Sequence, residues 1–160
     1  MASSTPGPSL SLQIKRTFQA PREKVWAAWT ERKGLEQWMC RDVPTHHPKY
    51  LELDVRPGGR YLIEIKQPDG VVYRGGGTFR EVKPPEKLVF TWAWTRTPES
   101  VKEPMPANDT VVTVQLFERG NATEMLFTHE GFDSDRERES HNKGWNGCFD
   151  KLTEYLKSGA

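Results

Sequence analysis

The sequence predicts an α+β fold in which an antiparallel sheet of about six to seven strands packs against a long C-terminal helix. Three observations lead to this prediction. Apolar residues recur at a period of two from Tyr50 onward for about eighty residues, which indicates strands with one buried face. Two short helical segments separate this stretch from a first strand. An amphipathic stripe near the C-terminus predicts the long helix.

The first strand is predicted over residues 10–18, where Leu10, Leu12 and Ile14 alternate with polar neighbours. Pro21 is expected as the first helical residue, a position at which proline loses no helical hydrogen bond. Thr30 is expected to cap a second short helix. The apolar residues of the two helices follow at helical spacing: Val25, Trp26 and Trp29 in the first, then Leu35, Trp38 and Met39 in the second.

The later strands are separated by turns rich in glycine and proline, which predicts an antiparallel meander. Alternation places Leu51, Leu53 and Val55 on one face of the first of these strands. A long surface loop is expected over residues 96–109, which contain three prolines. The predicted strands cover residues 50–55, 61–66, 71–82, 88–95, 110–118 and 123–130.

The C-terminal helix is predicted to begin at Ser134, which forms a capping box with Glu137. Its apolar stripe consists of Trp145, Phe149, Leu152 and Leu156, with Cys148 and Tyr155 beside it. We expect one domain over residues 10–158, preceded by a flexible polar tail at residues 1–9.

Composition excludes several classes of protein. The 160 residues include 23 basic and 22 acidic side chains, for a net charge of +1, which argues against nucleic acid or an anionic membrane as partner. No apolar run approaches the ~18 residues of a membrane helix. The N-terminus has neither a basic region nor an apolar block, so no secretory signal is expected. Two cysteines without a CxxC pair predict a reducing, cytoplasmic location.

Two candidate chemical motifs are better explained structurally. Gly75-Gly76-Gly77 resembles a phosphate loop, but a strand follows it where a helix would be needed, so we expect a bulge or bend that another backbone or a helix approaches closely. The histidines and cysteines lack the spacing of a zinc motif, so no metal is expected. They are Cys40, His46, His47, His129, His141 and Cys148.

His129 shares the apolar face of its strand with Met125 and Phe127, which predicts an inward side chain. A hydrogen-bonded core histidine is favoured over a ligand-binding or basic one, with the backbone of residues 131–134 as its expected partner. No G-x-S-x-G nucleophile motif is present, and no catalytic residue is predicted. The inward tryptophans, among them Trp92 and Trp145, either fill the core or line a cavity.

The order of elements resembles the helix-grip fold of the superfamily that joins START domains and the birch-pollen allergen (SRPBCC). Several segments are similar to the branch named for the activator of the heat-shock-protein-90 ATPase (AHSA-type). They are residues 18–26, 35–38, 56–61 (RPGGRY), 84–92, 128–132 (THEGF) and 144–145. The resemblance implies a sheet wrapped around the C-terminal helix with a cavity between them, and it implies no universal catalytic residue.

The favoured function is therefore the binding or carriage of a small hydrophobic molecule, aromatic or fatty, held by one or two hydrogen bonds. No cofactor is expected, and the protein is expected as a monomer or homodimer. The alternatives are a protein-interaction module that acts on a chaperone or another partner, and an enzyme of cyclase or hydrolase type that uses the cavity. The candidate cavity residues are Trp38, Tyr61, Ile63, Tyr73, Phe90, Trp92, Trp94, Phe127, His129, Trp145 and Phe149.

Overall fold

The computed structural model describes residues 10–41, 47–66, 68, 70, 72–95 and 110–158, without the side chains of Trp94 and Thr95. The predicted tail at residues 1–9, the predicted loop at 96–109 and His46 lie outside the described residues.

Seven antiparallel strands form one sheet in the order β1-β7-β6-β5-β4-β3-β2. Together with three helices they confirm the predicted α+β fold of helix-grip type. The strands are β1 (Leu10–Phe18), β2 (Pro48–Leu53), β3 (Arg60–Lys66), β4 (Val72–Lys83), β5 (Lys87–Thr95), β6 (Thr110–Arg119) and β7 (Ala122–Phe132). The helices are α1 (Arg22–Thr30), α2 (Arg32–Trp38) and α3 (Asp135–Lys157).

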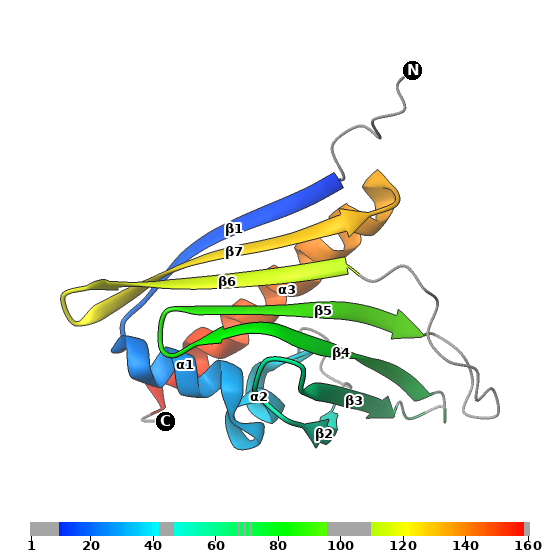
Figure 1. Cartoon of the computed structure of the whole chain (residues 1–160), viewed down its shortest axis with the longest axis horizontal. Coiled ribbons are helices and arrows are strands. Elements are labelled where there is room, and N and C mark those ends of the chain that lie inside the picture. The colour runs from blue at the N-terminus through cyan, green and yellow to red at the C-terminus, as the bar shows by residue number, and fades with distance from the viewer. Residues whose placement is uncertain are drawn as a thin grey trace.

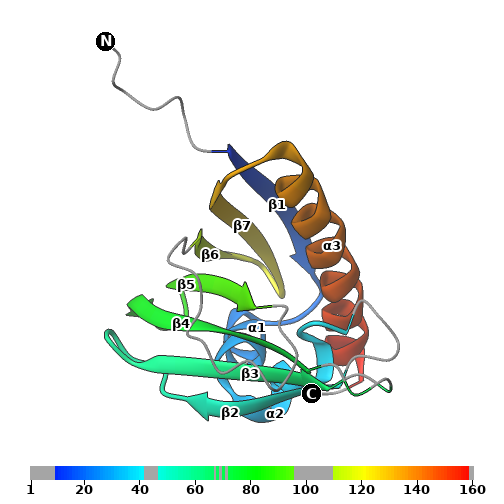
Figure 2. The same cartoon turned by 90° about the vertical axis from the view of Figure 1, so that its right-hand side faces the viewer.

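The sheet curves around the helices. Figure 1 shows α3 running diagonally behind the strands, and Figure 2 shows the sheet bending from β1, beside α3, round to β2 at the opposite edge. The short helices α1 and α2 lie at the lower end of the molecule in Figure 2, where α1 packs against β6 and β7 and α2 packs against β2. The concave face of the sheet is therefore covered by α3 beside β1 and β7, by α1 beside β6 and β7, and by α2 beside β2.

The long helix is positioned by its apolar stripe, because the predicted residues Trp145, Phe149, Leu152 and Leu156 are all buried. Its N-terminus is capped as predicted: the Ser134 hydroxyl accepts a hydrogen bond from the backbone N–H of Glu137, at 3.1 Å. This cap satisfies one of the amide groups that the first helical turn leaves without an intrahelical partner.

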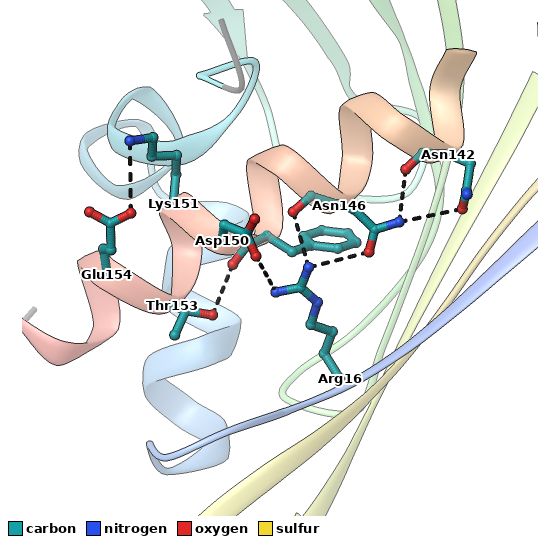
Figure 3. A network of polar contacts seen from close by, with 8 residues as sticks. Arg16, Asn142, Asn146, Asp150, Lys151, Thr153 and Glu154 are labelled. Carbon is teal, nitrogen blue, oxygen red and sulfur yellow. Dashed lines mark hydrogen bonds and ion pairs between the residues drawn. The ribbon is translucent and has the colours of Figure 1, made fainter. Parts of the chain in front are cut away.

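A polar network also fixes α3 to β1 (Figure 3). The Arg16 guanidinium donates from Nη1 to Asp150 Oδ1 at 2.8 Å, and from Nη2 to the Asn146 carbonyl oxygen at 3.1 Å. The same guanidinium lies 6.0 Å from the centroid of the Phe149 ring. Arg16 therefore covers the ring that α3 buries most deeply and holds the helix against the edge strand.

Two helix boundaries differ from the prediction. Pro21 is the extended residue before α1 rather than its first helical residue. Thr30 does not cap α2: it is the last residue of α1, and its hydroxyl donates to the Trp26 carbonyl oxygen at 2.8 Å. The N-cap of α2 is Glu31, without a side-chain hydrogen bond. A threonine inside a helix has a carbonyl four residues earlier within reach, and this local bond replaces the cap.

The predicted face of β2 is wrong for Leu51, whereas Leu53 and Val55 pack against the core. Leu51 is 43% exposed, whereas Tyr50 is 4% exposed and Leu53 is partly buried. The register of β2 against β3 shifts between Tyr50 and Glu52. An irregularity of this kind breaks the period of two, so Tyr50 and Leu53, three residues apart, both face inward and Leu51 faces outward. Val55 lies beyond the end of the strand at Leu53.

The three glycines lie inside β4, as the bend interpretation requires. A Cβ atom at Gly77 would overlap the Thr91 carbonyl oxygen of β5, and one at Gly76 would lie 2.5 Å from the Tyr61 carbonyl oxygen of β3. Beside them the main-chain pairing is modified, because the Thr78 N–H donates to the Thr91 hydroxyl at 2.8 Å. The glycines therefore permit the close approach of both neighbouring strands, and phosphate binding is not needed to explain them.

Candidate functional site

An apolar pocket lies between the two short helices and strands β2 to β5. It lies at the end of the sheet away from β1, and none of its described lining residues comes from α3. Among the residues that the structure describes, no charged side chain lines the pocket. The residues that line it are Trp29, Leu35, Met39, Tyr50, Leu53, Tyr61, Phe79, Phe90 and Trp92.

The side chains nearly fill this pocket. The space open to the centre of a water molecule measures about 10 Å³, which is close to the minimum that one water molecule requires. A larger occupant therefore has to displace side chains. Met39 is suited to this displacement because an unbranched thioether adopts many rotamers at low cost.

Between the sheet and α3 the aromatic residues are in direct contact. The ring centroids of Phe127 and Trp145 lie 4.7 Å apart, those of Phe127 and Phe149 lie 5.0 Å apart, and those of Trp92 and Trp145 also lie 5.0 Å apart. These distances are those of favourable aromatic pairs. In this part of the interior the aromatic residues fill the space beneath the helix, and Trp92 connects them to the wall of the apolar pocket.

His129 is fully buried and has a hydrogen-bond partner at each ring nitrogen. The Trp145 indole N–H donates to His129 Nδ1 at 3.0 Å. His129 Nε2 and the Thr110 hydroxyl are 2.6 Å apart, and that hydroxyl donates to the Trp92 carbonyl oxygen at 2.7 Å. The histidine is therefore a hydrogen-bonded core residue, as predicted, but its partners are Thr110 and Trp145 rather than the backbone of residues 131–134.

This chain of hydrogen bonds determines the protonation of the ring. An indole N–H can only donate, so His129 Nδ1 must be unprotonated and the proton of the neutral ring lies on Nε2. Burial, with a smaller contribution from His141, lowers the pKa of His129 to about 3. The ring thus donates to Thr110 and offers no lone pair to its hydroxyl, so the pair does not form a nucleophile and base.

The phenol of Tyr61 is also occupied, because it donates to the Thr91 carbonyl oxygen at 2.5 Å across the glycine segment of β4. Burial is the main reason that the pKa of the other phenol in the pocket, Tyr50, is raised well above its ordinary value. Nearby Cys40 and Tyr61 raise it further. The polar tips of the apolar pocket are therefore uncharged.

Trp29 carries a buried polar atom in the wall of the apolar pocket. It is 2% exposed, and its indole nitrogen is buried without a hydrogen-bond partner. By contrast, the indole N–H of Trp38 donates to the Ala28 carbonyl oxygen at 2.9 Å. Trp29 lies at the centre of the aromatic core, with its ring 4.7 Å from that of Trp38 and 6.2 Å from that of Phe90.

The predicted cavity residues separate into groups. Tyr61, Phe90 and Trp92 line the apolar pocket. Two of the others lie in the strands: Ile63 is buried in β3, and Tyr73 is half-buried in β4. The aromatic and hydrogen-bonded core near α3 contains the remaining five with described side chains, which are Trp38, Phe127, His129, Trp145 and Phe149. The Trp94 side chain lies outside the described residues.

Six lining residues were not predicted for the cavity. Phe79 could have been found, because it lies on the same face of β4 as Tyr73 by simple alternation. The others depend on where α1 and α2 dock and on the irregularity in β2, which the sequence does not reveal. The six are Trp29, Leu35, Met39, Tyr50, Leu53 and Phe79.

No group of three or more metal-ligating side chains gathers within the described part of the chain. His47 is exposed there, and Cys40 and Cys148 are buried. Among the same residues, none of the helices combines the length and the apolar character needed to cross a membrane.

Solved structures with the same fold come from several bacteria. An AHSA1 protein from Silicibacter pomeroyi is 22% identical, with a TM-score of 0.79 over 94% of this chain and 100% of its own. A protein from Arthrobacter aurescens is 25% identical, with a TM-score of 0.78 over 94% of this chain and 87% of its own. A third protein, from Chromobacterium violaceum, is 23% identical, with a TM-score of 0.77 over 91% of this chain and 96% of its own.

A comparison with curated protein sequences gives no significant match. The family model described as "Activator of Hsp90 ATPase homolog 1-like protein" matches residues 19–157, which is most of the chain. The segments whose resemblance the sequence suggested fall within this range, apart from Phe18 at its start. The chain therefore belongs to the AHSA1 family of activator of Hsp90 ATPase homolog 1-like proteins.

Proposed function

We propose that this protein binds a small hydrophobic molecule in the apolar pocket between α1, α2 and strands β2 to β5. The observation that carries the proposal is the convergence of nine apolar and aromatic side chains, eight from six elements and Met39 directly after α2, on one interior space. None of these described lining residues is charged. Apolar concave sites with a few polar groups are the usual form of small-molecule sites.

The ligand enters by exchanging with side chains rather than by filling an open cavity. Tyr61, Phe90 and Trp92 form a wall anchored in the sheet, while Leu35, Met39 and Leu53 lie on the shorter elements opposite. A ligand the size of one aromatic ring buries about 200 Å², which at ~25 cal/mol/Å² amounts to about 5 kcal/mol. The cost of repacking reduces this value, so dissociation constants of about 1 mM are expected for single-ring compounds.

The test compares two substitutions by ligand-detected NMR with toluene and ethylbenzene as probes. Leu53→Phe fills the pocket from its partly buried edge and should abolish saturable binding. Leu62→Phe is the matched control, because Leu62 points to the other face of β3, between buried Tyr61 and Ile63. Equal binding to both variants, or no saturable binding to the wild-type protein, would contradict the proposal.

The family description supports a second candidate, stimulation of a chaperone ATPase. An interaction of this kind would use the surface of the protein, so it should not depend on the pocket. Adding the wild-type protein to purified Hsp90 and measuring ATP hydrolysis tests it. A rate increase that Leu53→Phe leaves unchanged would favour this function, whereas no increase at a ten-fold molar excess would exclude it.

A further inference from the structure

We propose that the occupant of the apolar pocket is an uncharged molecule with a hydrogen-bond acceptor, such as a carbonyl oxygen, and that the indole N–H of Trp29 donates to it. This inference rests on the proposed function of the same pocket and specifies the chemical class of its ligand.

The first argument is the unsatisfied donor. Buried polar groups in native proteins nearly always have a hydrogen-bond partner, and each exception calls for an explanation such as an absent water molecule or ligand. Trp38, Tyr61 and Trp145 follow the rule, since each donates to an acceptor within 3.0 Å. The indole nitrogen of Trp29 does not. Because Trp29 belongs to the pocket wall, an acceptor bound in the pocket would complete its bonding.

The neighbouring rings do not replace this acceptor. Trp29 and Trp38 meet edge to face, at an interplanar angle of 74°. A contact between an N–H group and an aromatic face is a weak hydrogen bond at most. A carbonyl oxygen at 2.8–3.0 Å is a stronger acceptor, so a ligand that supplies one gains affinity over a ligand of the same shape that does not.

The second argument is the absence of charge around the site. The lining residues include no acid, base or histidine in the described part of the chain. Both lining phenols are neutral, since burial raises the pKa of Tyr50 well above its ordinary value and Tyr61 donates its proton to the Thr91 carbonyl oxygen. A carboxylate or ammonium group in the pocket would lose its hydration without gaining a counter-ion. The ligand is therefore neutral.

The experiment uses three single-ring probes of similar size with the full chain. Acetophenone carries a carbonyl oxygen, α-methylstyrene has a methylene group in its place, and benzoate carries a charge. Dissociation constants are measured by NMR titration for the wild-type protein, for Trp29→Phe and for Trp26→Phe. The last variant is the matched control, because Trp26 lies on the same helix and is only partly buried outside the pocket lining.

We expect Trp29→Phe to weaken acetophenone binding about ten-fold, which corresponds to about 1.4 kcal/mol. The same substitution should change the dissociation constant of α-methylstyrene by less than about two-fold. Trp26→Phe should change the dissociation constant of neither probe. Benzoate should not bind at concentrations that saturate the site with acetophenone. If Trp29→Phe changes the dissociation constants of acetophenone and α-methylstyrene by the same factor, or if benzoate binds more tightly than acetophenone, the inference is wrong while the proposed function stands. If no probe binds the wild-type protein, both fail.

A spectroscopic measurement on the wild-type protein covers the case in which Trp29→Phe does not fold. The indole ¹H–¹⁵N signal of Trp29 can be assigned through its contact with the Trp38 ring. Acetophenone should move this proton signal downfield as a hydrogen bond forms, whereas α-methylstyrene should not. Equal displacement by both probes would overturn the inference.

Discussion

The buried histidine predicts a specific dependence of stability on pH. In the unfolded chain an imidazole titrates near pH 6.5, whereas in the folded protein the pKa of His129 is lowered to about 3 by burial. Between these two values the unfolded state binds one proton more than the folded state. The free energy of unfolding therefore falls as the pH decreases, by up to about 1.4 kcal/mol per pH unit. Between pH 6.5 and pH 4.5 this single group should remove about 2 kcal/mol of stability.

His129→Gln isolates this contribution. The glutamine oxygen can accept from the Trp145 indole and its amide can donate to the Thr110 hydroxyl, so both hydrogen bonds of the buried ring have replacements. Glutamine does not titrate. The variant should be less stable than the wild-type protein at pH 7 by about 1–2 kcal/mol, because its shape differs from that of the ring it replaces. Because only the wild-type protein loses the ~2 kcal/mol of the buried ring, the difference should vanish or change sign by pH 4.5, with the variant then as stable as the wild-type protein or more stable.

Urea unfolding followed by tryptophan fluorescence at pH 7, 6.5, 5.5 and 4.5 measures the free energies. His141→Gln is the control, since it changes the half-buried ring whose centroid lies 5.3 Å from that of His129. This control should follow the wild-type curve within about 0.5 kcal/mol at every pH. Wild-type and His129→Gln curves that stay parallel from pH 6.5 to 4.5 would refute the reasoning, because the buried ring would then titrate equally in both states.

Three further substitutions test the packing, each by urea unfolding. Phe149→Asp introduces a carboxylate without a counter-ion at a fully buried position of α3, so the free energy of unfolding should fall by several kcal/mol. A loss below about 1 kcal/mol would contradict the packing of α3 against the sheet. Gly77→Ala should destabilise the protein by about 1–3 kcal/mol, because its Cβ would overlap the Thr91 carbonyl oxygen and the backbone must move; wild-type stability would mean that β4 and β5 do not approach this closely. Arg16→Ala should lower the free energy of unfolding by about 1–3 kcal/mol. Asp150→Asn should lower it by less than about 1 kcal/mol, because Asp150 is largely exposed and the other contacts of the guanidinium remain. Equal losses would show that the ion pair accounts for the whole effect.

Local patterns were enough to predict most elements of the fold. The Ser134 cap, the alternation in β1 and the stripe from Trp145 to Leu156 depend on residues close in sequence, and the structure contains all three. The inward position of His129 followed from the same alternation. Predictions of this kind succeed because the period of a helix or strand places each side chain on a definite face.

Only the tertiary structure decided which groups meet across the core. The partners of His129 lie 19 and 16 residues away in the sequence, on β6 and α3, so no local pattern indicates them. The irregularity in β2 turned Tyr50 inward and Leu51 outward although the sequence alternates regularly there. Docking of α1 and α2 against the sheet brought Trp29, Leu35 and Met39 to the apolar pocket. Aromatic and aliphatic residues bury equally well in many arrangements, so composition predicts that they lie inside, whereas packing in three dimensions selects the few that surround an interior space.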